Sequence, residues 1–171
     1  MGRATVHIVE DCAEVRGSLA ELASSMGLRP IEYSSAGEFL ARFRGGETGP
    51  ACLILDMGSP RASHFNLQES LYAAGVRIPT IILYDDADAA TAVEIMKQGA
   101  VDFVQKPFSP LAMASAIQQS IDDAAKRYRY DSLREAASRR IAMLSPRERE
   151  AFDLLVRCFT TKQISQRFNI G

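Results

Sequence analysis

The chain has 171 residues, of which 47% are hydrophobic and 24% are charged, and this balance is that of an ordinary soluble globular protein with one sizeable core and a small appendage. No apolar stretch is long enough to span a bilayer and the N-terminus has no signal-peptide pattern, so we expect a cytoplasmic protein with no membrane partner. Cys12, Cys52 and Cys158 are odd in number and lack metal-ligand spacing, which indicates reduced thiols.

The net charge of −1 conceals an uneven distribution along the chain. Residues 1–125 hold 9 Lys and Arg against 16 Asp and Glu, a net charge of −7, whereas residues 126–171 hold 11 against 5, a net charge of +6. An acidic body with a basic tail indicates two modules, the second suited to nucleic acid. The alternative for the stretch from Lys126 to Arg140 is a solvated, Arg-rich helix.

In chain order, the first 110 residues predict five strands that alternate with helices. The strands are expected at Thr5–Val9, Leu28–Tyr33, Ala51–Leu55, Thr80–Tyr84 and Val101–Val104. The helices between them are expected to carry Val15 to Met26, then Phe39 to Phe43 up to Gly45 and Gly46, then Phe65–Ala74, then Ala87–Gln98. Because parallel strands need crossover connections, this alternation predicts an α/β fold with a doubly wound parallel sheet.

The most informative stretch is Ala51 to Pro60, which reads ACLILDMGSP. A continuous apolar run closed by turn residues is typical of a strand buried on both faces of a parallel sheet. Asp56 then stands at the carboxyl end of a central strand, where open α/β sheets place their ligands. The alternative is an Asp that only starts the next turn.

Charged residues also follow two other predicted strands. Glu10 and Asp11 come after the first strand and Lys106 after the fifth. Three clustered carboxylates would repel one another, and a Mg²⁺ ion together with a Lys ammonium removes that cost. The metal would also neutralise a transferring phosphoryl group while Asp56 acts as its nucleophile.

From Ala4 to about Ser120 the sequence resembles the receiver domain of two-component response regulators. The resemblance rests on ED after the first strand, LILDMGSP around Asp56 and DFVQKPF at the end. It implies a flavodoxin-like, five-stranded sheet of order 2-1-3-4-5, which brings the ends of strands one, three and five to one crevice.

The resemblance implies that Asp56 is the phosphoacceptor. It implies that Glu10, Asp11, Asp56 and the backbone carbonyl of Gly58 bind Mg²⁺. A different class of function, an Asp-nucleophile phosphatase, is disfavoured. Such an enzyme needs a second catalytic carboxylate two residues after the nucleophile, and this chain has Gly58 there. We therefore expect no enzymatic activity.

The resemblance further implies that Lys106 contacts the phosphoryl group, that Lys106-Pro107 is a cis peptide and that Phe103 is the aromatic switch. One departure concerns the end of the fourth strand, where the family has a Ser or Thr followed by a small residue and this chain has Tyr84 and Asp85. The Tyr hydroxyl lies too far from the backbone for the usual contact with the phosphoryl oxygen. Asp85 adds negative charge where a phosphodonor enters. The sequence therefore leaves two alternatives, a receiver that is phosphorylated in the cell and one that is not.

A single long helix is expected after Pro110, because the next Gly or Pro is Pro146. Its apolar residues follow helical spacing and are Ala114, Ile117, Ile121, Ala124 and Tyr128, then on a shifted stripe Leu133, Ala137, Ile141 and Leu144. The first part is expected to pack on its own sheet, from Leu111 to Ile121. The rest needs another partner, such as a second chain through a short coiled coil that Asp131 interrupts. We therefore expect a homodimer.

The last stretch predicts two short helices. Ser145 caps the first, with Pro146 at its first position and Glu148 completing a capping box, and Thr160 or Thr161 caps the second. The runs LSPREREAFDLL and TTKQISQRFNIG resemble the first half of a LuxR-type helix-turn-helix domain. In that family the recognition helix comes next, so it is expected to be absent from a chain ending at Gly171, and the DNA-contacting residues stay unknown.

The sequence thus predicts a receiver domain at 1–120, a linker helix at 121–143 and the first part of a helix-turn-helix domain at 144–171. The predicted function is a bacterial response regulator of transcription, with a sensor histidine kinase or other signalling protein and DNA as partners. The alternative is a phosphorylation-independent module that works by protein–protein contact.

Overall fold

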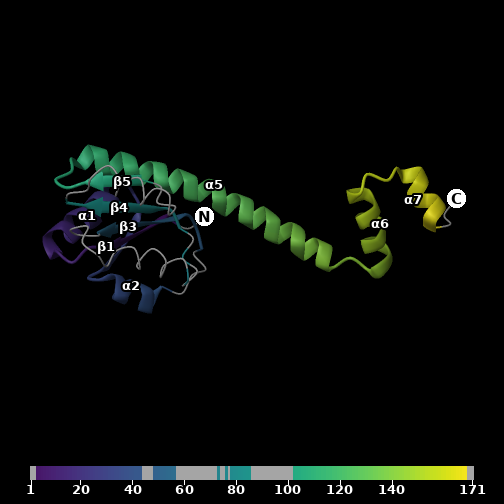
Figure 1. Ribbon diagram of the computed structural model, residues 1–171, viewed down its shortest axis with the longest axis horizontal. Helices are drawn as coiled ribbons and strands as arrows, with labels where there is room; N and C mark the ends of the chain where they lie inside the picture. Colours follow the sequence, from purple (N-terminus) through teal and green to yellow (C-terminus); the bar gives the residue numbers. More distant parts are fainter. Residues whose placement is uncertain are drawn as a thin grey trace. The chain divides into compact units, whose positions relative to one another are not determined.

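The computed structural model describes residues 3–43, 48–56, 73, 76, 78–85 and 102–168. Its centre is a sheet of five parallel strands in the order β2-β1-β3-β4-β5 (Figure 1). The strands are β1 Thr5–Val9, β2 Arg29–Tyr33, β3 Ala51–Asp56, β4 Thr80–Tyr84 and β5 Asp102–Gln105. The predicted α/β, flavodoxin-like fold is confirmed, and each strand lies within one residue of its predicted bounds.

The register brings the functional strand ends to one edge of the sheet. Val9, the last residue of β1, pairs with Tyr33 of β2 on one side and with Leu55 of β3 on the other. Asp56 pairs with Leu83, one residue before the end of β4. Because all five strands are parallel, the residues that follow β1, β3 and β5 emerge together at this carboxyl edge.

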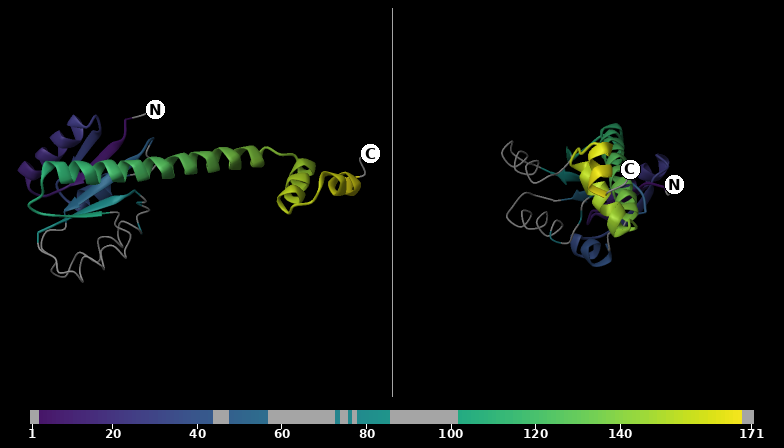
Figure 2. Two further views of the ribbon diagram at one scale, coloured as in Figure 1. Left: turned by 90° about the horizontal axis from the view of Figure 1, so that it is seen from above. Right: turned by 90° about the vertical axis from the view of Figure 1, so that its right-hand side faces the viewer.

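Helices cover both faces of the sheet, and β3 contributes side chains to each. Cys52 and Ile54 belong to the core beneath α1 (Ala13–Ser25) and α5 (Pro110–Ala142), which lie on the same face (Figures 1 and 2). Leu53 and Leu55 belong to the core of the other face, which includes Phe39 of α2 (Ala36–Arg42). A strand buried on both sides explains why ACLIL is apolar throughout instead of alternating.

Local signals set the ends of the first two helices. Gly27 adopts φ +77° just past α1, a left-handed conformation that Gly adopts without a Cβ clash. Ser35 is the N-cap of α2 and its hydroxyl accepts from the Glu38 N–H at 3.1 Å. The structure ends α2 at Arg42, and Gly45 and Gly46 lie outside the described residues. The predicted helices Phe65–Ala74 and Ala87–Gln98 also fall outside them, apart from Ala73.

Helix α5 is uninterrupted over 33 residues, as its sequence predicts. Its first half packs on the sheet through apolar residues that include Met113 and Ile117, both fully buried. Leu111, expected on the packed face, is instead 81% exposed, because it stands two residues before the buried Met113 and so lies on roughly the opposite side of the helix. Residues 126–140 are all exposed.

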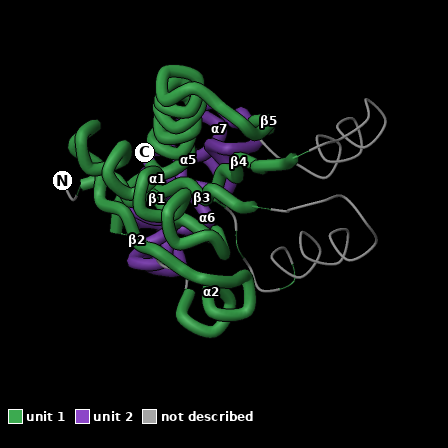
Figure 3. The backbone as a smooth tube through the Cα atoms, turned by 90° about the vertical axis from the view of Figure 1, so that its left-hand side faces the viewer, with its two compact units in different colours: residues 1–128 green, residues 129–171 purple. Residues whose placement is uncertain are grey.

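The last two helices are α6 (Pro146–Val156) and α7 (Thr161–Phe168). The predicted capping box of Ser145 and Glu148 is present, and Thr160 fills the same role for α7 by exchanging hydrogen bonds with Gln163. The chain divides into two compact units, residues 1–128 and 129–171 (Figure 3). Among the helices described, none combines the length and apolar character that crossing a membrane requires.

Candidate functional site

Three carboxylates meet at the carboxyl edge of the sheet. Glu10 and Asp11 follow β1 and Asp56 ends β3, and one oxygen from each lies within 4.8 Å of the others. Glu10 is 1% exposed, Asp56 is partly buried and Asp11 is exposed. The sheet topology thus brings together residues 45 positions or more apart in the sequence.

The Lys106 ammonium joins two of these carboxylates. Its Nζ lies 2.8 Å from Oε2 of Glu10 and 2.9 Å from Oδ1 of Asp56. Burial acts to lower the pKa of Lys106, but its hydrogen bonds to Glu10 and Asp56 outweigh this and hold that pKa above its usual value. Burial raises the pKa of Glu10 and the charge of Asp56 adds to the rise, while the bonds from Lys106 and Cys12 oppose it. Lys106 is therefore a cation held among carboxylates.

The loop between β1 and α1 is fixed by several hydrogen bonds. The Glu10 N–H donates to the Tyr33 carbonyl at 3.2 Å, and the Cys12 N–H donates to Oε1 of Glu10 at 3.0 Å. Arg16, in the first turn of α1, donates from Nη1 to the carbonyl oxygens of Glu10 at 2.8 Å and Asp11 at 3.2 Å. The acidic loop is thus held from both the sheet and the helix.

Arg16 is a residue that the sequence analysis missed. A signal for it existed, because a cation in the first turn of a helix faces the positive end of the helix dipole and is disfavoured there. An Arg at that position indicates a compensating partner, and here the partners are two carbonyls and the Glu32 carboxylate at 3.5 Å.

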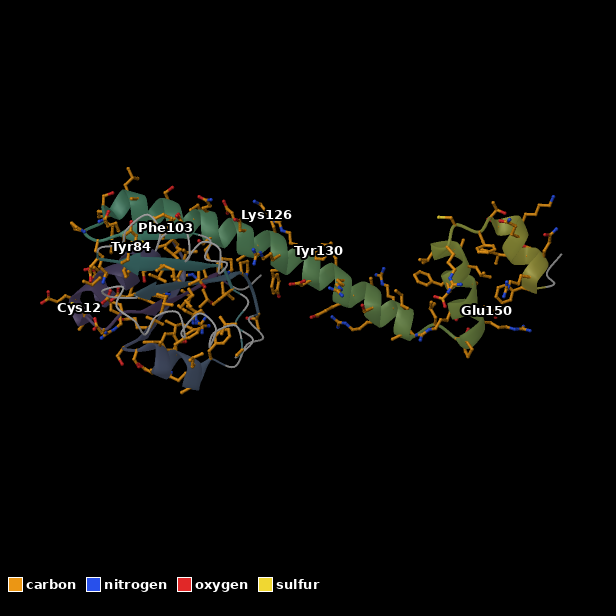
Figure 4. The ribbon with its side chains drawn as sticks, viewed as in Figure 1. Cys12, Tyr84, Phe103, Lys126, Tyr130 and Glu150 are labelled. Carbon is orange, nitrogen blue, oxygen red and sulfur yellow. The ribbon has the colours of Figure 1, made fainter. Side chains whose placement is uncertain are left out.

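Tyr84 packs against Phe103 at the end of the sheet. Their ring centroids lie 5.7 Å apart with the planes inclined at 47° (Figure 4). Phe103 pairs with Ile82 in the register, so Tyr84, two residues further along β4, lies diagonally opposite it on the same face. Phe103 is itself packed on the core beneath α2. Asp85 follows as an exposed residue.

An open groove of about 610 Å³ adjoins the site. Helix α1 supplies one wall, with Val15 and Leu22, and Pro107 and Phe108 supply the other. Lys106 and Asp85 both line this groove, so the charged cluster borders an apolar surface. The Lys106-Pro107 peptide bond beside it is cis.

The donor set fits a magnesium ion. Mg²⁺ binds oxygen ligands, favours a small number of carboxylates and retains several waters. Glu10, Asp11 and Asp56 each offer a carboxylate oxygen to one small volume. Gly58, whose carbonyl is the fourth expected ligand, lies outside the described residues.

Comparison with known proteins agrees with this geometry. Residues 6–118 match the response regulator receiver domain, which is well over half of the chain. The chain belongs to the response regulator family. The receiver fold and the acidic edge described above are therefore those of a response regulator.

The similarity extends beyond the receiver domain to nearly the whole chain. The transcriptional regulatory protein FixJ of Azorhizobium caulinodans is 35% identical over 97% of this chain and 78% of its own length. The C4-dicarboxylate transport transcriptional regulatory protein DctR of Rhodobacter capsulatus is also 35% identical, over 98% of this chain and 85% of its own. Among solved structures, the response regulator StyR matches with a TM-score of 0.82 at 31% identity, over 99% of this chain and 85% of that chain.

Proposed function

We propose that the protein is a response regulator of transcription in which Asp56 is the phosphoacceptor. The main support for this proposal is that three carboxylates and the Lys106 ammonium lie together at one edge of the sheet. A sensor histidine kinase is the proposed phosphodonor. A carboxylate oxygen of Asp56 would attack the phosphorus, and the bond from phosphorus to the donor nitrogen would break.

The surrounding residues have distinct roles in this proposal. Glu10, Asp11 and Asp56 would hold Mg²⁺ together with the carbonyl of Gly58, and the bound ion would neutralise charge on the phosphoryl oxygens. Lys106 already lies 2.9 Å from Asp56, where its ammonium would contact the transferred group. Phe103 is the proposed switch residue.

Phosphorylation can be tested with a small phosphodonor. Intact mass after incubation with acetyl phosphate and Mg²⁺ should show one added phosphoryl group in the wild type and none in Asp56→Asn. Calorimetric titration with Mg²⁺ should show saturable binding that weakens in the same variant. An unchanged mass in the wild type, or equal Mg²⁺ affinity in both proteins, would contradict the assignment.

The output is proposed to be DNA binding through a LuxR-type domain. The two capped helices α6 and α7 support this, and so do relatives named as transcriptional regulatory proteins. In this proposal residues 1–120 form the receiver, 121–143 the linker helix and 144–171 the first part of the helix-turn-helix domain. A homodimer is proposed, formed through the receiver face built from the fourth predicted helix, Ala87–Gln98, and the fifth strand, through the linker helix, or through both.

A second candidate function is a module whose output does not depend on phosphate. It is favoured by Tyr84, whose ring packs on Phe103, and by Asp85, whose charge lies on the groove beside Lys106. In this case Asp85 repels small phosphodonors, and Tyr84 keeps Phe103 in place whatever the state of Asp56. The output would then be set by a partner protein or by the dimer interface.

The same mass measurement separates the two candidates. The comparison variant is Tyr84→Thr/Asp85→Ala, which restores a hydroxyl at the end of the strand and removes the charge. If the double variant is modified on Asp56 much faster than the wild type, the second candidate is supported. Equal rates with near-complete modification of both proteins would exclude a blocked site.

A further inference from the structure

Arg16 contacts both peptide groups that flank Asp11. The Glu10 carbonyl belongs to the peptide before the Asp11 Cα and the Asp11 carbonyl to the peptide after it, and Nη1 of Arg16 donates to both, at 2.8 Å and 3.2 Å. Two fixed peptide planes determine the φ and ψ angles of the residue between them. They therefore determine the direction in which the Asp11 side chain leaves the backbone.

Asp11 depends on such an anchor more than its two neighbours do. Glu10 is 1% exposed and its side chain is bonded to Lys106 and to the Cys12 N–H. Asp56 ends a buried strand. Asp11 is exposed, and it lies in the short connection between β1 and α1.

The Arg16 guanidinium is itself held in place. Its side chain is only 19% exposed, and Nε lies 3.5 Å from Oε2 of Glu32 near the end of β2. A planar guanidinium with donors on several sides suits this bridging position better than an ammonium does. The helix α1, the strand β2 and the acidic loop are thus joined at one side chain.

We infer that Arg16 is a positioning residue for the metal site, which holds Asp11 in the orientation that binds Mg²⁺. The inference rests on the proposed magnesium site. The inference predicts the direction in which the Mg²⁺ affinity changes when Arg16 is replaced, because the charge of Arg16 and its hold on the Asp11 backbone affect that affinity in opposite directions. Removing a nearby cation would by charge alone strengthen Mg²⁺ binding, whereas releasing the Asp11 backbone weakens it.

The test is calorimetric titration of the 171-residue chain with Mg²⁺ and, separately, with Ca²⁺. In Arg16→Gln the Mg²⁺ affinity should fall at least about tenfold, the lower end of the loss that follows when a supporting hydrogen bond to a metal ligand is removed. The Ca²⁺ affinity should fall by less than about threefold, because Ca²⁺ accepts irregular ligand geometry and Mg²⁺ demands a near-ideal octahedron.

Arg3→Gln is the matched control. Arg3 also donates from its guanidinium to a backbone carbonyl, that of Gly27 at 3.1 Å, but it lies just before β1, whereas the acidic loop follows β1. This variant should bind both ions like the wild type. It reports any general effect of removing an Arg that bonds to a backbone carbonyl.

The outcomes separate this inference from the proposed function. Unchanged or tighter Mg²⁺ binding in Arg16→Gln would overturn the positioning role, and so would an equal loss for both ions, which indicates a general disturbance. If Asp56→Asn weakens Mg²⁺ binding and Arg16→Gln does not, only the inference about Arg16 fails. If Asp56→Asn has no effect, the proposed site itself fails.

Discussion

Replacing Lys106 by Met should destabilise the receiver measurably, because it leaves one buried and one partly buried carboxylate without their cation. The Glu10 side chain is fully buried and loses a 2.8 Å ion pair, and Asp56, 11% exposed, loses one at 2.9 Å. Breaking a buried ion pair from one side costs about 3–5 kcal/mol. Because Lys106 is 19% exposed and water reaches the gap, the lower end of that range, about 3 kcal/mol, applies.

A second route to this magnitude is protonation of Glu10. In the variant, Glu10 can avoid its unpaired charge by taking up a proton. Starting from the ordinary carboxyl pKa of 4.5, this costs about 3.4 kcal/mol at pH 7, at about 1.36 kcal/mol for each pH unit. This is an upper limit to the penalty from Glu10, and the estimate of about 3 kcal/mol lies below it.

The assay is urea unfolding at pH 7 without metal, followed by circular dichroism. The control is Lys126→Met, because Lys126 also pairs with a carboxylate at 2.9 Å, that of Asp123, but is 76% exposed. An exposed pair contributes much less to stability than a buried one, because water screens its charges. A loss in Lys106→Met no larger than that in Lys126→Met would refute the view that Lys106 neutralises buried charge. Saturating Mg²⁺ should restore part of the loss, because the ion neutralises the same carboxylates.

Four further predictions follow from other parts of the chain. Glu38→Gln should be less stable than the wild type at pH 7, because hydrogen bonds from Ser34 lower the pKa of Glu38 to about 2 and make its ionised form the stabilising one. The difference in stability should vanish as the pH falls from 4.5 through about 2, and urea unfolding across pH measures it. Cys158→Gly should stabilise α6 against thermal unfolding by about 1 kcal/mol and Cys158→Ala should not, since Cys158 has φ 62°, where a Cβ is strained. The 171-residue chain should prefer a promoter fragment over random DNA by less than about tenfold in a competition assay, or roughly 1.4 kcal/mol. Light scattering should show a dimer, and Leu133→Lys should dissociate it if the exposed stripe of α5 forms the interface, since Leu133 is 72% exposed.

The fold was predictable because each element carries its own local signal. The stretch from Ala51 to Leu55 is apolar at every position, as a strand with helices on both faces must be, and the structure buries all five residues. The strand order was not derivable from such patterns, since they do not say which strands are neighbours. It came from the family resemblance and is the order observed.

The charged part of the site was predictable for a related reason. Glu10 and Lys106 follow strands and Asp56 ends one, and the ends of parallel strands lie at one edge whatever the side-chain rotamers are. The supporting contacts were not predictable in this way. The bonds of Arg16 to two carbonyls depend on the path of a short loop and on the conformation of a long side chain, which strand and helix periodicity does not specify.

Tyr84 shows where prediction from strand ends stops. The sequence places it at the end of β4, but only the register shows that it lies diagonally opposite Phe103, on the face that packs beneath α2. A Tyr on that face gains contact with an aromatic ring, whereas a Ser or Thr would leave the ring of Phe103 without this neighbour. Aromatic pairs are worth about 0.5–1.5 kcal/mol beyond the area that they bury, so any state in which Phe103 moves away must first overcome that energy. The residues that would bind the phosphoryl group therefore differ in kind from those that would respond to it. The binding residues are carboxylates and a Lys positioned by the strand ends, whereas the responding residues are two aromatic rings that pack against each other.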